Sequence, residues 1–128
     1  MKQHSPGFLA LVASAKRGIR ECTCAAVKAR LDRGERFVLI DVREDHEWAQ
    51  DHIEAAVHIG RGILERDVEE LIPDKDADLV LYCGGGYRSA LAAETLQKMG
   101  YRRAQSMDGG IRAWREAGLS LVAGDAQG

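Results

Sequence analysis

Two short hydrophobic runs stand out along the chain and predict β-strands. They cover residues 37–40 and 79–82, and each is followed at once by a chemically active residue, Asp41 and Cys83 respectively. Because both runs are continuously apolar rather than alternating, they are typical of strands buried on both faces of a parallel sheet. Weaker apolar runs predict three further strands, at residues 19–21, 56–59 and 104–107.

Segments with helical spacing lie between these runs. The clearest covers residues 88–99, where an apolar stripe repeats at helical intervals and Gly100 provides the C-terminal stop. Thr23 is a suitable N-cap for a helix over residues 24–33, and a short amphipathic helix is predicted after Pro6. Other helices are predicted at residues 44–50, 63–71 and 111–117. This alternation of strands and helices predicts an α/β fold with helices on both faces of a parallel sheet.

The domain organisation follows from length and composition. A chain of 128 residues without internal repeats or a linker is expected to form one α/β domain, which we assign to residues 19–122. Residues 1–18 are predicted to be a helical extension, and the small polar residues 123–128 a frayed tail. Ligands of such folds bind outside the carboxyl ends of the strands, where Asp41 and Cys83 are expected.

Charge and cysteine content narrow the functional classes. The chain has 18 basic and 20 acidic residues, well mixed, with a net charge of −2, which argues against a nucleic acid or an anionic membrane as partner. Three cysteines are an odd number and predict a reducing, cytoplasmic setting rather than a disulfide framework. Lys2 and the Ala13-Ser14-Ala15 triplet resemble an export signal only crudely, so export is the lesser alternative.

Two of the cysteines, Cys22 and Cys24, are close enough in sequence to suggest a zinc site or a redox pair. A zinc site needs about four ligands, and no histidine of the chain has metal-type spacing to complete one. We therefore expect no metal, and interpret Cys22 as the end of a strand and Cys24 as the start of a helix.

The candidate chemistry lies in the glycine-rich segment between a predicted strand and a predicted helix: Cys83, Gly84, Gly85, Gly86, Tyr87, Arg88 and Ser89. Glycines let backbone N–H groups approach a ligand closely, and successive N–H groups form an anion-binding nest. The start of the following helix adds partial positive charge, and Arg88 adds a full one. These groups would stabilise a Cys83 thiolate and an anionic group attached to its sulfur. An inert core cysteine followed by a simple turn is the simpler interpretation, but so many suitable residues in one short loop favour function.

This loop resembles the active-site loop of rhodanese-type sulfurtransferases, Cys-x-x-Gly-x-Arg-Ser. Three further segments resemble family motifs in the same order: Asp41 with Arg43, His52-Ile53 with Ala55-Ala56-Val57, and Gly109-Gly110 with Ala113-Trp114. The likeness covers nearly all of residues 19–122. It departs from the family at Glu54 and Ala55, where proline and glycine are usual, and we expect this to alter a turn without loss of activity.

The resemblance implies a rhodanese-like three-layer sandwich with a mainly parallel five-stranded sheet, and a thiosulfate sulfurtransferase activity. The Cys83 thiolate would take the sulfane sulfur of a donor such as thiosulfate, hold it as a persulfide and pass it to cyanide, to a thiol or to a protein acceptor, without a cofactor. Residues 84–89 would bind the persulfide, while Asp41 and Arg43 would support the loop.

Two kinds of alternative remain open. Cysteine phosphatases, and arsenate reductases with a similar loop, have five residues between cysteine and arginine, whereas this chain has four, between Cys83 and Arg88. The shorter loop forms a tighter cradle that suits a single sulfur atom better, and no carboxylate stands out as a general acid. A non-catalytic binding module with the same fold is the other alternative, although such modules usually lose the cysteine that this chain retains.

Overall fold

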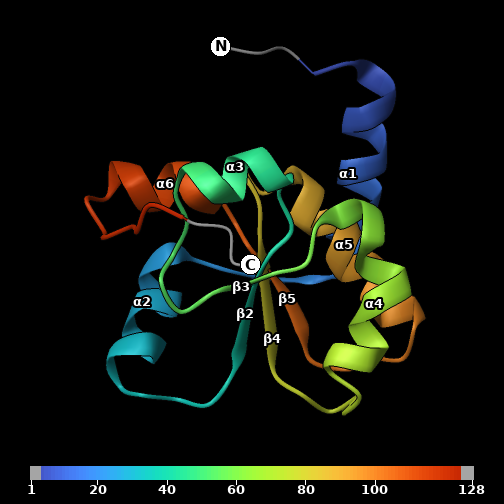
Figure 1. Ribbon diagram of the computed structural model, residues 1–128. Coiled ribbons are helices and arrows are strands. Elements are labelled where there is room, and N and C mark those ends of the chain that lie inside the picture. Colours follow the sequence, from blue (N-terminus) through green and yellow to red (C-terminus); the bar gives the residue numbers. More distant parts are fainter. Residues whose placement is uncertain (1–3, 125–128) are drawn as a thin grey trace.

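Five parallel strands form the centre of the computed structural model, which describes residues 4–124 (Figure 1). Their order across the sheet is β1-β5-β4-β2-β3, and every strand pair is parallel. The strands are β1 (Arg20–Cys22), β2 (Val38–Asp41), β3 (Val57–His58), β4 (Leu79–Tyr82) and β5 (Ala104–Met107). The sheet predicted to be mainly parallel is therefore wholly parallel.

Helices cover both faces of this sheet, which confirms the predicted three-layer arrangement (Figure 1). They are α1 (Pro6–Gly18), α2 (Cys24–Asp32), α3 (Asp45–Gln50), the 3-10 turn η1 (Arg61–Ile63), α4 (Leu64–Leu71), α5 (Tyr87–Lys98) and α6 (Gly110–Glu116). Helices α4 and α5 lie on one face, and α2 and α6 lie on the other. Helix α1 packs against α5, and α3 lies across the carboxyl edge of the sheet.

The central strand β4 explains why its sequence is continuously apolar. All four of its residues are buried, because Leu79 and Leu81 pack toward α4 and α5 while Val80 and Tyr82 pack toward α2 and α6. The prediction of a strand buried on both faces is thus confirmed. Its neighbour β2 pairs Asp41 with Tyr82, so the residues that follow both strands reach the same edge of the sheet.

Most element boundaries differ from the predicted ones by one or two residues, which is the usual uncertainty of helix and strand ends. Thr23 acts as the predicted N-cap, since its Oγ1 accepts a hydrogen bond from the Ala26 N–H at 3.0 Å. Near the other end, Val122 forms an antiparallel bridge with His52, and the Gly124 N–H donates to the Ala49 carbonyl at 3.0 Å. The rest of the predicted frayed tail, residues 125–128, lies outside the described residues.

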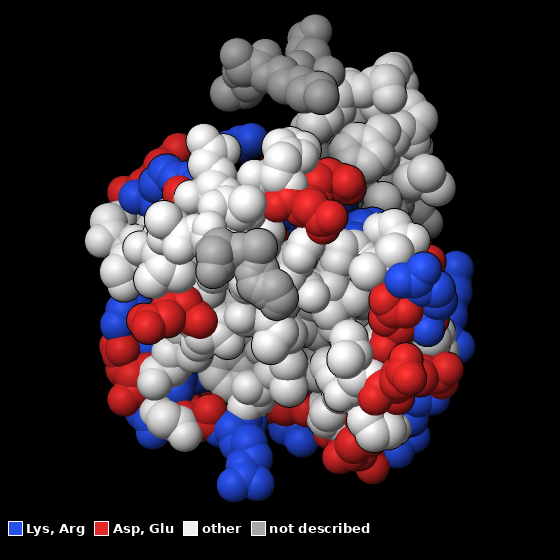
Figure 2. Space-filling view, in the orientation of Figure 1, with Lys and Arg blue, Asp and Glu red and all other residues white. Residues whose placement is uncertain are grey.

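Charged side chains of both signs are mixed around the rim of the face in Figure 2, and neither sign forms a continuous surface there. An uncharged band crosses the middle of this face. Among residues 4–124, no helix combines the length and the apolar character needed to cross a bilayer.

Candidate active site

Cys83 directly follows the central strand β4 and is fully buried. Its Sγ accepts hydrogen bonds from the N–H groups of Gly86, at 3.2 Å, and Ser89, at 3.3 Å. Gly86 is the N-cap of α5 and Ser89 lies in its first turn; this helix has 12 residues, and its N-terminal end carries partial positive charge. The sulfur therefore lies where backbone donors and the helix both favour a negative charge.

The conformation of this loop depends on glycines at two positions. Gly86 has a φ of +98°, a left-handed conformation that side chains disfavour, and a Cβ there would lie 3.0 Å from the Gly109 nitrogen. Gly110, at the start of α6, lies even closer to the loop, because a Cβ there would lie 2.5 Å from the Cys83 carbonyl oxygen and 2.7 Å from that of Gly84. The cysteine loop and the start of α6 are therefore in direct backbone contact.

Two buried hydroxyl groups lie next to the sulfur. The Ser89 Oγ is 3.5 Å from the Cys83 Sγ and 2.8 Å from the Ser106 Oγ. Ser106 belongs to β5, and both serines are fully buried. Each hydroxyl can donate as well as accept a hydrogen bond. The Ser89 hydroxyl, backed by that of Ser106, can therefore bind either a thiol or a thiolate at Cys83. Sequence reasoning identified Ser89 but missed Ser106, which carries no local signal within its strand.

The side chain of Arg88, a residue of the loop, forms a salt bridge with a carboxylate. Its Nη1 and Nη2 donate to the Glu47 carboxylate of α3 at 2.9 and 3.2 Å. Although burial disfavours the ionised carboxyl group, hydrogen bonds from Arg88 and the Glu44 N–H lower the pKa of Glu47 to about 2. The hydrogen bond to Glu47 in turn raises the pKa of Arg88, and the nearby Cys83 contributes to this. Glu47 was missed in the sequence, where its only signal is the capping box that it forms with Glu44.

Asp41 and Arg43 form a buried ion pair one strand away from the loop. The Arg43 Nη2 lies 2.9 Å from the Asp41 Oδ2, and the Arg43 N–H also donates to Asp41 at 2.9 Å. Burial opposes the charge of Arg43, but its hydrogen bond and attraction to Asp41 raise its pKa. A further Arg43 donor binds the Asp51 carbonyl at 2.6 Å. Within the described part of the chain, neither residue hydrogen-bonds to residues 84–89, so any support of the loop passes through the neighbouring strand.

Tyr87 connects the loop to the N-terminal helix, whose role the sequence left open. Its ring centroid lies 4.9 Å from that of His4 and 6.0 Å from that of Phe8. The Nζ of Lys16, also on α1, lies 5.6 Å from the centre of the Tyr87 ring. Helix α1 therefore packs against the first residue of α5 as well as along that helix.

The other two cysteines are not equivalent to Cys83. Cys22 ends β1 and Cys24 begins α2, as the sequence predicted, and all three thiols are free. Burial raises the pKa of Cys22 to about 11, and burial also raises that of Cys24. The Cys24 Sγ donates to the Gly110 carbonyl at 3.6 Å. Among residues 4–124, no group of three His, Cys, Asp or Glu side chains is placed to hold a metal ion.

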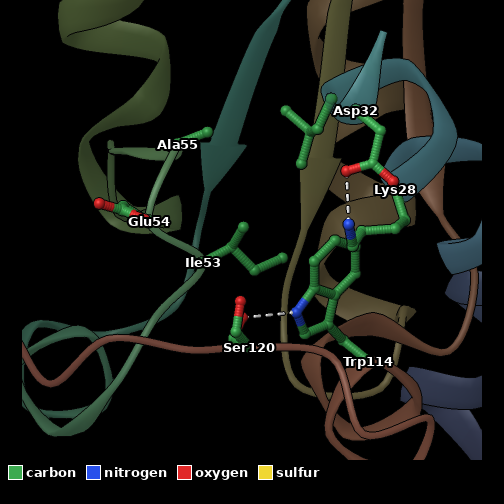
Figure 3. A pocket seen from close by; sticks show the side chains of 8 residues that line it. Lys28, Asp32, Ile53, Glu54, Ala55, Trp114 and Ser120 are labelled. Carbon is green, nitrogen blue, oxygen red and sulfur yellow. Dashed lines mark hydrogen bonds and ion pairs between the residues drawn. The ribbon is translucent and has the colours of Figure 1, made fainter. Parts of the chain in front are cut away.

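A pocket of about 310 Å³ lies elsewhere on the molecule, between α2, the turn at residues 53–55 and the segment after α6 (Figure 3). Its lining residues are Lys28, Leu31, Asp32, Ile53, Glu54, Ala55, Trp114 and Ser120. The Trp114 Nε1 at its wall donates to the Ser120 carbonyl at 3.0 Å. None of the predicted site residues lines this pocket, so it is separate from the cysteine loop.

The fold and the loop together define a class of protein: an α/β domain with a cysteine cradled by backbone N–H groups at the carboxyl edge of a parallel sheet. The model of the family described as "Rhodanese-like domain" matches residues 23–117. The chain therefore belongs to the rhodanese-like domain family.

Individual relatives agree with this assignment. The chain is 38% identical over 96 residues to a putative sulfurtransferase of Bacillus subtilis, covering 75% of this chain and 90% of the relative. It is 31% identical over 100 residues to a thiosulfate sulfurtransferase of Stutzerimonas stutzeri, covering 78% and 90%. A solved structure with a TM-score of 0.84 and 32% identity, covering 95% of this chain and 99% of that one, is a Rhodopseudomonas palustris protein of unknown function described as a possible tyrosine phosphatase. The family and the two relatives named as sulfurtransferases support sulfur transfer as the general activity.

Proposed function

We propose that this protein takes the sulfane sulfur of thiosulfate, holds it as a persulfide on Cys83 and passes it to a thiol or to cyanide. The observation that carries this proposal is the position of the Cys83 Sγ, which accepts N–H hydrogen bonds from Gly86 and Ser89 at the start of α5. Three free thiols in the chain agree with a reducing, cytoplasmic setting.

The proposed reaction has two steps. The Cys83 thiolate attacks the outer sulfur of thiosulfate, a sulfur–sulfur bond forms, and the sulfur–sulfur bond of thiosulfate breaks with its electron pair leaving on sulfite. An acceptor thiolate then attacks the outer sulfur of the persulfide and restores the Cys83 thiolate. The loop amides from Gly84 to Arg88 are the expected donors for the terminal sulfur. Because Cys83 has no exposed surface, we expect the donor to enter beside the partly exposed Gly84 and Gly85.

Phosphate transfer is the competing function, and two features of the loop favour sulfur transfer over it. Four residues separate Cys83 from Arg88, which makes a small cradle. The guanidinium of Arg88 is bound to Glu47, so a phosphate would have to displace a carboxylate that already accepts two hydrogen bonds.

The test is the intact mass of the protein after brief exposure to thiosulfate, with Cys83→Ser as the matched variant and p-nitrophenyl phosphate hydrolysis measured beside it. We expect a gain of one sulfur atom that is absent from the variant and is reversed by cyanide. No gain on folded protein with a free Cys83 would rule out thiosulfate as donor, and Cys83-dependent hydrolysis of the phosphate ester would support the phosphatase alternative instead.

A further inference from the structure

Arg112 is a second arginine at the cysteine loop, and the sequence did not single it out. The Arg112 N–H donates to the Gly84 carbonyl at 3.0 Å, which ties its backbone to the loop. Its guanidinium lies against Gly85, because a Cβ on that glycine would be 3.4 Å from Nη1, 3.7 Å from Cζ and 3.8 Å from Nη2. Arg112 is otherwise exposed. A positively charged group therefore stands beside Gly85, one of the two glycines where we expect the donor to enter.

The two arginines of the loop differ in how far their charge is compensated. Arg88 forms its salt bridge with Glu47 at 2.9 Å, so much of its charge is balanced within the protein. No Asp or Glu side chain among residues 4–124 lies within 4.0 Å of the Arg112 guanidinium. Arg112 therefore offers a positive charge to an incoming ligand. Arg88 also lies at this entrance, since its Nη2 would be 3.2 Å from a Cβ on Gly84, but its charge is shared with Glu47.

A guanidinium presents several N–H groups in one plane, which matches the spacing of two oxygens on a tetrahedral oxyanion. We propose that Arg112 binds the oxyanion group of the sulfur donor, with the sulfane sulfur directed toward Cys83. The preferred donors are then those whose sulfane sulfur is bonded to a sulfonate-type group, such as thiosulfate and organic thiosulfonates. This assignment rests on the proposed sulfur transfer. When the sulfur–sulfur bond breaks, the negative charge that collects on the leaving sulfite lies beside the same guanidinium.

The experiment compares Arg112→Gln with Arg115→Gln, which removes the same charge from the same helix but from a residue paired with Asp51 at 2.9 Å. The first readout is the thiosulfate concentration that gives half-maximal persulfide formation, measured at low ionic strength because salt screens exposed charges. Loss of a charged hydrogen-bond donor should raise this concentration about tenfold in Arg112→Gln. Arg112→Lys should retain part of the effect, and Arg115→Gln should match the unmodified protein.

A second readout does not depend on sulfur transfer. It is the ratio of Cys83 alkylation rates with iodoacetate, an oxyanion, and iodoacetamide, its neutral analogue, followed by peptide mass. Arg112→Gln should lower this ratio severalfold, because loss of the guanidinium slows the reaction with the anionic reagent more than the reaction with the neutral one. If both readouts are the same in Arg112→Gln and Arg115→Gln, Arg112 has no role in anion binding and the inference is overturned. If the unmodified protein forms no persulfide but the alkylation ratio falls in Arg112→Gln, the proposed function fails while the anion site stands.

Discussion

The contact between the cysteine loop and the start of α6 makes a quantitative prediction for Gly110→Ala. Gly110 has a φ of +58°, and a Cβ there would lie 2.5 Å from the Cys83 carbonyl oxygen, whereas ordinary contacts begin near 3.4 Å. The left-handed conformation costs a non-glycine residue roughly 1 kcal/mol, and forcing an atom into a packed site typically costs about 1–3 kcal/mol more. We therefore expect Gly110→Ala to lower the free energy of unfolding by about 2–4 kcal/mol.

Gly118→Ala is the matched control, because Gly118 has a similar φ of +76° but nothing within 4 Å of the added Cβ. It should lose only the conformational part, roughly 1 kcal/mol. Urea unfolding followed by circular dichroism gives both values, and the difference between the two variants isolates the steric contact.

The same substitution should also slow persulfide formation. Relief of the clash moves the loop carbonyls by about 1 Å, and a misplacement of that size can slow a reaction by about 100-fold. Gly118→Ala should react at the normal rate. Equal stability losses in the two alanine variants, together with equal rates of persulfide formation, would refute the view that α6 holds the cysteine loop in position.

Three further predictions concern the groups that support the site and the fold. Burial opposes the charge of Glu47, but the hydrogen bonds from Arg88 and the Glu44 N–H and the attraction of Arg88 and Arg43 together lower its pKa from 4.5 to about 2. Its carboxylate therefore stabilises the fold above pH 4.5 and loses this effect as the pH falls toward 2. In urea unfolding at a series of pH values, Glu47→Gln should lose less unfolding free energy on acidification than the unmodified protein. Identical pH profiles for the two proteins would contradict the pairing of Glu47 with Arg88. Asp41→Asn should cost about 3–5 kcal/mol of unfolding free energy, because it leaves the buried Arg43 cation without its carboxylate; a cost below about 1 kcal/mol would show that Arg43 finds another partner. Thr23→Ala removes the side-chain cap of α2 and should lower the free energy of unfolding, measured in urea, by about 1 kcal/mol. Thr23→Ser keeps a capping hydroxyl and should retain most of that stability.

The strands and helices were largely predictable because their signals are local. The run at residues 79–82 corresponds to β4 without error, since a strand buried on both faces must be apolar at every position. Strand β3 was predicted over residues 56–59 but covers only Val57–His58, because only these two residues pair with β2. Such short pairing depends on the neighbouring strand rather than on the pattern of the segment itself.

The candidate nucleophile and its cradle were determined by the sequence alone. Strand end, cysteine, glycines and helix start follow one another within residues 82–89, so the sequence already places the amides of Gly86 and Ser89 near the Cys83 sulfur. The exact position of the loop also depends on its contact with the start of α6. Only the tertiary structure decided which distant groups surround them. Glu47 lies 41 positions from Arg88, and Ser106 lies 17 positions from Ser89. Their contacts exist because the strand order places β2 and β5 on either side of β4, and because buried charges and hydroxyls require partners wherever the packing supplies them.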